Sequence, residues 1–280
     1  MSPPSPFYSR DGLNVQTYDL RTALDIARAT VRGDADWYAR RAREWGGPVL
    51  EGACGTGRVA WTLAEAGLEV TGFDLSPHML RQAEARRARM PGEVARRATF
   101  VPGDMADFDL GRTFPLAIVP FRAFQALLTP EAQRAALARF RAHLVPGGRL
   151  VLDLFDPRLD YLIPGTPSPV PDRESVRHPE RGTLVTVDIG ARAVDPLRQV
   201  FGEPWTFREH AADGEVLLEE TEVLELRWSY RYEMRHLFEI AGFEVEAEYS
   251  DFEESPPAYG KEQVWVLRSP QLRQGTLLDP

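Results

Sequence analysis

A short stretch of the sequence has residue types and spacing suited to holding a ligand that contains a ribose. Glu51 comes directly before a loop of small residues that includes Gly55 and Gly57, and Asp74 follows one helix and one strand later. Small residues let backbone N–H groups approach a ligand closely, and the first N–H groups of the following helix have no partner within that helix. A carboxylate such as Asp74 accepts hydrogen bonds from both hydroxyls of a ribose. The pattern therefore indicates a nucleotide-like binding site.

The elements that must position these residues alternate regularly between strand and helix. Ser76 and Pro77 are suited to an N-cap and a first helical position, and Gly67 is suited to a left-handed C-cap. Alternation at this spacing favours right-handed crossovers and a parallel sheet with helices on both faces, which binds ligands at the carboxyl ends of its strands. We expect strands beginning at Val49 and at 69–73, 98–101, 115–120 and 149–155, and helices at 58–66, 77–88 and 130–143.

The pattern changes after residue 156. A long proline-rich loop is expected at 156–179, followed by three runs with period-two alternation at 183–191, 199–210 and 215–227. Turn signals separate these runs, so they predict an antiparallel sheet inserted into the α/β domain. A helix at 232–241 then leads to strands at 244–249 and 263–268, which are expected to pair in antiparallel fashion at one edge of the parent sheet.

Composition narrows the function. Of the 280 residues, 43% are hydrophobic and 27% are charged, as in ordinary globular proteins. The formal net charge of −9 disfavours a general nucleic-acid or acidic-membrane binder. The single cysteine, Cys54, rules out an intramolecular disulfide and a cysteine-based zinc site, and no metal site is expected. With neither a signal peptide nor a long apolar run, the sequence predicts a cytoplasmic protein.

The motifs resemble those of class I S-adenosylmethionine-dependent methyltransferases. The resemblance covers residues 47–155 well and the last two strands more loosely. One departure is Ala53, which stands where the first motif has glycine; this matters if position 53 requires a positive φ. The matching stretches are Glu51-x-Ala53-x-Gly55-x-Gly57, Gly72-Phe73-Asp74-Leu75-Ser76, Gly103-Asp104-Met105, Val119-Pro120-Phe121 and Leu144-Val145-Pro146-Gly147-Gly148.

The resemblance implies a cofactor, S-adenosylmethionine, and a role for each motif. The glycine loop would hold the methionine end, Asp74 the ribose, and Asp104 the adenine amino group, while Met105 would lend an N–H and Leu75 and Met79 apolar faces to the adenine. The implied cofactor residues are Glu51, Gly52, Ala53, Gly55, Gly57, Arg58, Asp74, Leu75, Met79, Asp104, Met105, Pro120 and Phe121.

The resemblance also implies an α/β three-layer sandwich with a mostly parallel seven-stranded sheet, an antiparallel edge strand and an inserted antiparallel β-subdomain. The expected organisation is an N-terminal helical segment at 1–45, a Rossmann-like domain at 46–156 and 230–269, a β lid at 157–229 and a tail at 270–280. Residues 1 to about 14 are rich in proline and are expected to form an arm or to be poorly ordered.

The implied reaction is in-line transfer of a methyl group to a nitrogen or oxygen of a small molecule, largely by orientation of the reactants. Tyr18, Arg122, Tyr230 and His236 are acceptor-side candidates, and Arg122 could pair with a carboxylate or phosphate. The fourth motif lacks the Asn/Asp-Pro-Pro-aromatic pattern of enzymes that methylate DNA bases, which disfavours nucleic acid. The inserted sheet is similar to that of small-molecule N-methyltransferases, where it covers the cofactor and supports a possible homodimer.

Two other functions fit part of the pattern. Gly55-x-Gly57-x-x-Ala60 followed by Asp74 also satisfies the fingerprint of an NAD-dependent oxidoreductase. A non-catalytic protein that binds S-adenosylmethionine would carry the same motifs. Glu51, Asp104 and the edge hairpin favour the methyltransferase over the NAD enzyme, because a dinucleotide enzyme would have another βα unit there.

Overall fold

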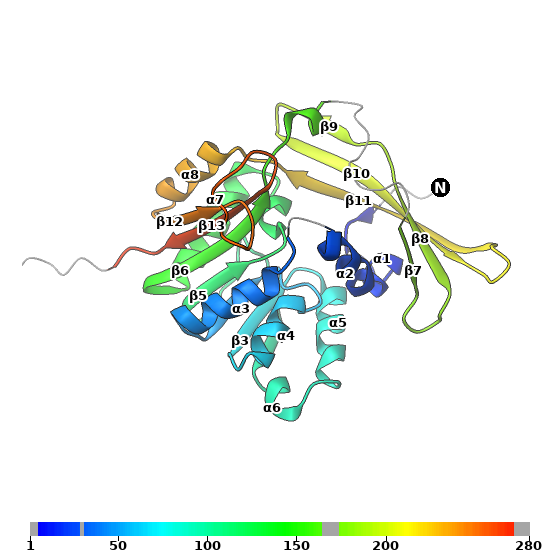
Figure 1. Cartoon of the computed structure of the whole chain (residues 1–280), viewed down its shortest axis with the longest axis horizontal. Helices are drawn as coiled ribbons and strands as arrows, with labels where there is room; N and C mark the ends of the chain where they lie inside the picture. The colour runs from blue at the N-terminus through cyan, green and yellow to red at the C-terminus, as the bar shows by residue number, and fades with distance from the viewer. Residues whose placement is uncertain (1–4, 29–30, 164–173, 272–280) are drawn as a thin grey trace, which may run out of the picture.

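The computed structural model describes residues 5–28, 31–163 and 174–271, which form two β-sheets with helices packed between and around them (Figure 1). The strand order of the larger sheet is β12 (Glu244–Tyr249), β13 (Glu262–Arg268), β6 (Leu144–Phe155), β5 (Phe114–Val119), β2 (Val49–Gly52), β3 (Val70–Asp74) and β4 (Ala98–Pro102). The second sheet contains β1 (Ser5–Pro6), β11 (Val216–Arg227), β10 (Val200–His210), β8 (Leu184–Ile189) and β7 (Glu174–Arg177), with β9 (Ala193–Asp195) beside β10.

The larger sheet confirms the predicted fold class. Strands β4, β3, β2, β5 and β6 are parallel, whereas β13 is antiparallel to both β6 and β12. The strand of opposite direction is thus second from the edge, because β12 pairs outside it. The helices are α1 (Leu13–Gln16), α2 (Tyr18–Arg28), α3 (Asp34–Trp45), α4 (Arg58–Glu65), α5 (Pro77–Arg87), α6 (Gly92–Ala95), α7 (Pro130–Ala142) and α8 (Arg231–Ile240), with 3-10 turns η1 (Ala123–Ala126) and η2 (Leu159–Tyr161).

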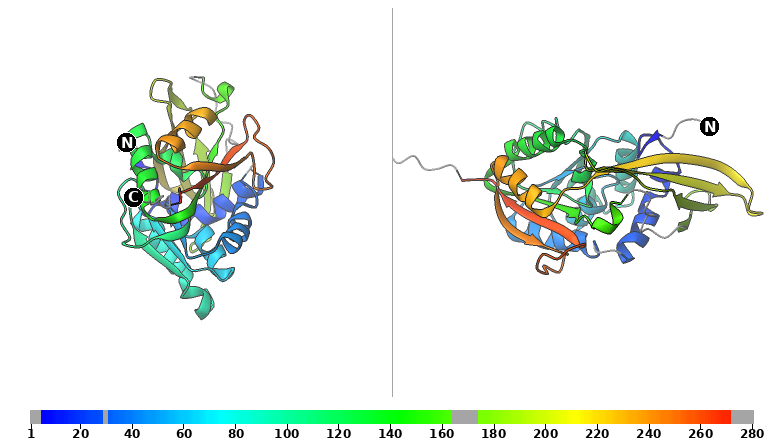
Figure 2. Two further views of the ribbon diagram at one scale, coloured as in Figure 1. Left: turned by 90° about the vertical axis from the view of Figure 1, so that its left-hand side faces the viewer. Right: turned by 90° about the horizontal axis from the view of Figure 1, so that it is seen from above.

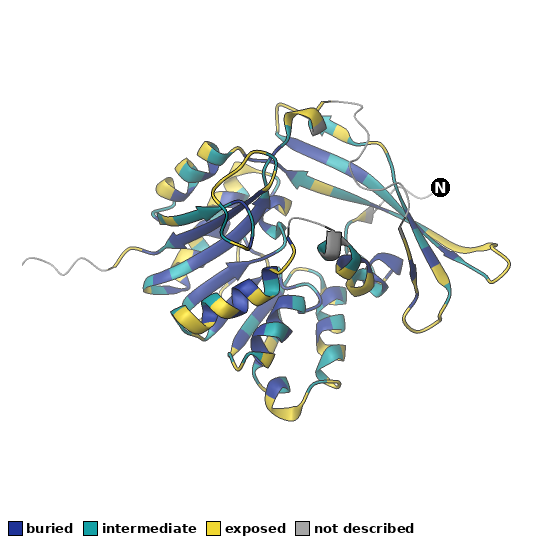
Figure 3. Ribbon diagram, in the orientation of Figure 1, coloured by how far each residue is buried: buried dark blue, intermediate teal, exposed yellow. Residues whose placement is uncertain are grey.

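Alternation along each strand divides the core into two layers. In β5, Leu116 and Ile118 join a cluster with α3 and α4, whereas Ala117 and Val119 join a second cluster with α7 and α8. The right-hand view in Figure 2 shows α7 and α3 on opposite sides of the sheet. Buried residues are concentrated along the central strands, whereas the far tip of the β10–β11 hairpin is exposed (Figure 3). The interior strands can therefore be apolar on both faces.

The three alternating runs form β8, β10 and β11, as predicted, but the second sheet is larger than expected. Residues 174–177 form β7 within the stretch expected to be a loop, and 193–195 form the short β9. Residues 164–173 of the predicted loop, residues 1–4 of the predicted arm and residues 272–280 of the predicted tail lie outside the described residues. The proposed domain boundaries stay a prediction.

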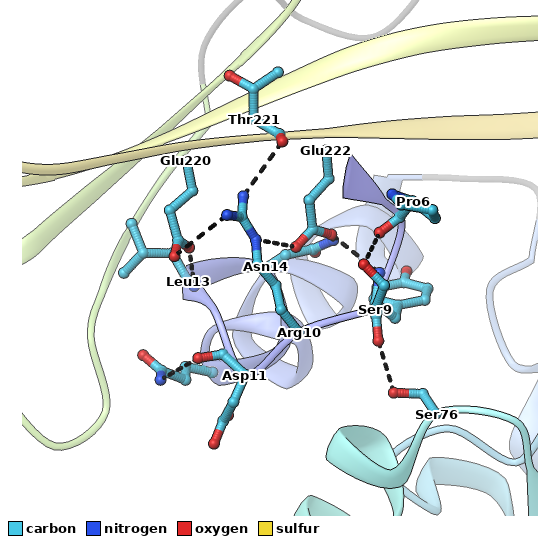
Figure 4. A network of polar contacts seen from close by, with 12 residues as sticks. Pro6, Ser9, Arg10, Asp11, Leu13, Asn14, Ser76, Glu220, Thr221 and Glu222 are labelled. Carbon is cyan, nitrogen blue, oxygen red and sulfur yellow. Dashed lines mark hydrogen bonds and ion pairs between the residues drawn. The ribbon is translucent and has the colours of Figure 1, made fainter. Parts of the chain in front are cut away.

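The described part of the N-terminal stretch is a structural element, which corrects the expectation of an arm. Strand β1 pairs in parallel with β11, with Ser5 opposite Glu222. The fully buried Glu222 carboxylate accepts hydrogen bonds from the Tyr8 amide, Arg10 Nε and Asn14 Nδ2, at 3.0, 3.2 and 2.6 Å (Figure 4). On the other side, the Ser76 hydroxyl donates to the Tyr8 carbonyl at 2.7 Å. Residues 5–14 therefore connect the second sheet to the loop that follows Asp74.

No helix within the described part of the chain is long and apolar enough to cross a membrane.

Replacing Phe140 by alanine should lower the free energy of unfolding by about 3–5 kcal/mol, because this fully buried ring of α7 packs against the larger sheet. Urea denaturation followed by circular dichroism measures the change. Arg134→Ala, at an exposed position of the same helix, is the control and should change stability by no more than about 0.5 kcal/mol. Equal losses in the two variants would contradict the packing described here.

Candidate functional site

The glycine loop between β2 and α4 has three residues in the left-handed region: Ala53, Gly55 and Gly57, with φ of 52°, 55° and 74°. Ala53 therefore adopts the conformation that makes its departure from the family motif costly, by roughly 1–2 kcal/mol. A Cβ on Gly57 would lie 2.9 Å from the Phe100 ring, whereas a Cβ on Gly55 would have no atom within 4 Å. Gly57 is thus required for packing, and Gly55 faces open space that a ligand can enter.

Gly52, the last residue of β2, is also explained by packing, because a Cβ there would lie 2.6 Å from Cζ of Phe140.

Asp74, the last residue of β3, joins the glycine loop to the start of α5. Its Oδ2 accepts from the Gly55 amide and its Oδ1 from the Ser76 amide, both at 2.8 Å. Burial raises the pKa of Asp74 above its ordinary value, although the two hydrogen bonds partly oppose this shift. The Gly103 amide donates to the Asp74 carbonyl at 3.1 Å, which brings the end of β4 alongside. Each carboxylate oxygen can accept a further hydrogen bond, so the group can serve a ligand hydroxyl as well.

The residues implied for the adenine differ in accessibility. Asp104 is exposed, and its Oδ1 accepts from the Ala106 amide at 2.8 Å. Leu75 is 74% exposed beside Asp74, but Met79 and Met105 are buried. Asp104 and Leu75 are therefore open to a ligand, whereas the methionine side chains line the interior.

Glu51 is a buried carboxyl at the base of the loop. It is 2% exposed, and within the described structure its Oε2 is buried without a hydrogen-bond partner. Burial raises the pKa of Glu51 to about 8, and the nearby charge of Arg58 only partly opposes this effect. An orphaned acceptor of this kind costs free energy unless a donor reaches it. A ligand ammonium group would fit this position.

Arg58, at the start of α4, is held by two contacts. Its guanidinium forms a bidentate ion pair with the buried Asp34, with Nη1 2.8 Å from Oδ1, and lies 5.2 Å from the centroid of the Phe121 ring. Tyr18 is close enough that the charge of Arg58 lowers its pKa, although burial raises that pKa overall. The structure therefore brings Arg58, Phe121 and Tyr18 together beside the glycine loop.

Pro120, Phe121 and Arg122 follow β5, the strand next to β2. Pro120 is buried, and the Arg122 side chain pairs with the buried Glu262 of β13, with Nε 3.1 Å from Oε2. Arg122 thus already has an internal carboxylate partner. A contact between Arg122 and a substrate stays a prediction.

Tyr230 and His236 belong to the α8 region, and α8 packs against β12 at the edge of the sheet opposite β4. The start of this region lies closer to Arg122, because the Ser229 carbonyl accepts from Nε2 of Gln263, the residue after Glu262, at 3.2 Å. Tyr230 lines an open hollow of about 530 Å³ together with Trp228 and Glu233. His236 is 68% exposed, and its Nδ1 is 3.3 Å from Glu239 Oε2. The structure does not bring either residue to the glycine loop.

Sequence reasoning missed several residues that the structure places at or beside the site. Tyr8 lies in a proline-rich stretch, and nothing in the sequence pairs Asp34 with Arg58, which lies 24 residues away. Asp153 and its partner Tyr38 had a usable signal, because a single acid inside the apolar strand 149–155 has to be buried and therefore has to be paired.

Comparisons with known proteins agree with this geometry. Residues 49–148 match the family described as "Methyltransferase domain". The solved structure of CalS10, an amino pentose methyltransferase from Micromonospora echinaspora with S-adenosylmethionine bound, is 31% identical, with a TM-score of 0.61 and coverage of 84% of this chain and 87% of that one. The chain belongs to the class I S-adenosylmethionine-dependent methyltransferases.

Two further matches cover most of this methyltransferase. The CcbJ methyltransferase from Streptomyces caelestis has a TM-score of 0.71 at 25% identity, and 86% of this chain and 91% of that chain are covered. The cypemycin N-terminal methyltransferase of a Streptomyces species is 29% identical over 252 residues, which are 88% of this chain and 89% of the relative. Membership of this family excludes the NAD-dependent oxidoreductase. It also favours an enzyme over a protein that only binds S-adenosylmethionine.

The residues present fit S-adenosylmethionine. That cofactor carries its methyl group on a positively charged sulfonium. When the methyl group is transferred, the rest of the cofactor leaves as a neutral thioether. Glu51 offers a buried, unpartnered oxygen for its ammonium, Gly55 offers open space along the loop, and Asp74 offers a carboxylate for its ribose.

Asp74→Ala should weaken S-adenosylhomocysteine binding by about 2–4 kcal/mol, because the ribose would lose its acceptor and the Gly55 and Ser76 amides would lose their partner. Isothermal titration calorimetry measures the affinity. Asp107→Ala, at an exposed acid beyond β4, is the control and should bind like the wild type. Unchanged affinity in Asp74→Ala would place the ribose elsewhere.

Binding of S-adenosylhomocysteine should release a proton near neutral pH, because the pKa of Glu51 is about 8 and a ligand ammonium favours its ionised form. The affinity should therefore rise from about pH 6 to about pH 7.5, below the range in which the ligand's own amino group titrates. Calorimetry in buffers of different ionisation enthalpy measures the release. Glu51→Gln should remove it, and equal proton release in both proteins would contradict the assignment.

Proposed function

We propose that this enzyme transfers the methyl group of S-adenosylmethionine to an amine nitrogen of a small molecule bound between the larger sheet and the second sheet. The observation that carries the proposal is the match to CalS10, which covers 84% of this chain. CalS10 is an amino pentose methyltransferase, and the cypemycin enzyme acts at an N-terminus. Both acceptors carry an amine.

The formal net charge of −9 supports a cationic acceptor, because an ammonium-bearing molecule is attracted to a protein with an excess of carboxyl groups. The amine then has to lose its proton before its lone pair can attack, with the new N–C bond forming as the C–S bond breaks.

The proposed cofactor contacts are those implied by the family motifs: the loop 51–58, Asp74 with Leu75, and Asp104. On the acceptor side we retain Tyr18 and Arg122, since Tyr18 lies beside Arg58 and Arg122 follows β5. The N-terminal residues 5–14 and the second sheet cover this region and would limit the access of water.

The same proposal includes a cytoplasmic enzyme that does not bind nucleic acid and that forms a homodimer. The absence of paired cysteines and the net charge of −9 support the first two points. Exposed apolar residues near the tip of β11, Val216, Leu217 and Leu218, support contact with a second copy.

The acceptor class can be tested with a panel of paired compounds. Purified enzyme is incubated with S-adenosylmethionine and either amino sugar nucleotides or short peptides with a free α-amino group, and each amine is compared with its hydroxyl analogue. Mass spectrometry should detect methylated amines together with S-adenosylhomocysteine, and Asp74→Ala should be inactive at subsaturating cofactor. Methylation of the hydroxyl analogues alone would make the nitrogen assignment wrong.

A further inference from the structure

The loop after β5 has an unusual backbone. Phe121 and Arg122 have φ of 58° and 63°, and they are the only two consecutive non-glycine residues with positive φ in the described parts of the chain. Each such residue costs on the order of 1 kcal/mol or more. Two adjacent residues in this conformation persist only when other contacts offset the backbone cost, and the hydrogen bonds of residues 121 and 122 show which group does so.

The contacts converge on one carboxylate, that of the fully buried Asp153 in β6. The Phe121 amide donates to Oδ1 and the Arg122 amide to Oδ2, both at 3.0 Å. Successive N–H groups that point to one side form a concavity that takes an anion, and here the anion is a side chain of the same protein. The Tyr38 hydroxyl of α3 also donates to Oδ1, at 2.7 Å.

The loop at residues 120–122 contacts both the glycine loop and strand β13. The Phe121 ring packs against the Arg58 guanidinium at the glycine loop, and the Arg122 side chain pairs with Glu262 of β13. A change in the backbone at 121–122 would therefore move a residue beside the cofactor loop and a charge on the acceptor side together.

We propose that Asp153 is a positioning residue for methyl transfer, which holds the loop 120–122 so that Phe121 and Arg122 keep their places between the cofactor loop and the acceptor. The proposal rests on the proposed function in one respect, the location of the acceptor beside this loop. Asp153 acts through the two backbone amides and does not itself touch the reacting atoms.

The protonation of Asp153 matters because a neutral carboxyl offers only one good acceptor oxygen. Burial and the negative charges of Glu262 and Asp34 together raise the pKa of Asp153 to about 7, against the opposing effect of the hydrogen bonds from Tyr38 and the Arg122 amide. The positive charge of the Arg122 guanidinium is paired with Glu262. The loop should therefore be held most firmly above neutral pH and released as the pH falls through about 7.

The test compares full-length Asp153→Asn with Asp156→Asn, a matched control at the residue that follows the same strand. Asp156 accepts from the Gly260 amide and Gln263 Nε2, at 2.8 and 2.9 Å. Hydrogen exchange of the Phe121 and Arg122 amides, corrected for intrinsic rates, should show about tenfold less protection in Asp153→Asn and no change in Asp156→Asn. Affinity for S-adenosylhomocysteine should stay within about threefold of the wild type in both.

A second measurement covers the case in which Asp153→Asn does not fold. In the wild type the corrected protection of these two amides should fall as the pH decreases from about 8 to about 6, and Tyr38→Phe should shift that step, because it removes one donor to Oδ1.

Where Asp153→Asn does fold, kinetics give a further readout. With an amine that the wild type methylates, kcat should fall about tenfold in Asp153→Asn with little change in the KM for the cofactor.

Unchanged amide protection in Asp153→Asn, or no pH step in the wild type, would overturn the proposal. Loss of S-adenosylhomocysteine binding as large as that of Asp74→Ala would also overturn it, because Asp153 would then act on the cofactor. Failure of the wild type to methylate any amine would contradict the proposed function instead, and the amide exchange result would still decide whether Asp153 holds the loop.

Discussion

The site depends on a buried carboxylate that binds backbone amides at the end of a parallel strand. Asp74 fixes Gly55 and Ser76 relative to each other, and thereby sets the distance between the glycine loop and the start of α5. Without that carboxylate the Gly55 amide would lose its partner, and the loop would remain linked to β3 through the hydrogen bond from the Cys54 amide to the Phe73 carbonyl, at 2.9 Å. The same group is then available to a ribose, so the architecture and the binding chemistry share one side chain.

Much of this arrangement could be predicted from sequence, because its signals are local. Strand and helix alternation, the capping residues Ser76 and Pro77, and the acids that end β3 and β4 each depend on a few adjacent residues. The fold class and the cofactor follow from them. The second sheet was predicted for its long strands, whose alternation is clear, but not for β7 and β9, which are short and depend on pairing with a neighbour for their stability.

The rest could not be predicted because it depends on contacts between distant segments. The partners of Asp34, Arg122 and Asp153 are separated from them by 24, 140 and more than 30 residues. The periodicity of a sequence predicts its helices and strands, but it does not predict which acidic side chain pairs with which arginine. The place of His236 likewise depends on the strand order, because α8 packs against β12 at the edge of the larger sheet and His236 is exposed there.

The contact between Tyr8 and Glu222, 214 residues apart, has a consequence for the order of folding. Residues 5–14 leave the ribosome long before they find their partner, because β11 has to be synthesised before β1 can pair with it. The glycine loop and Asp74 can assemble much earlier, since their elements are close in sequence. A nascent chain therefore carries a cofactor loop without its cover until most of the protein has been made.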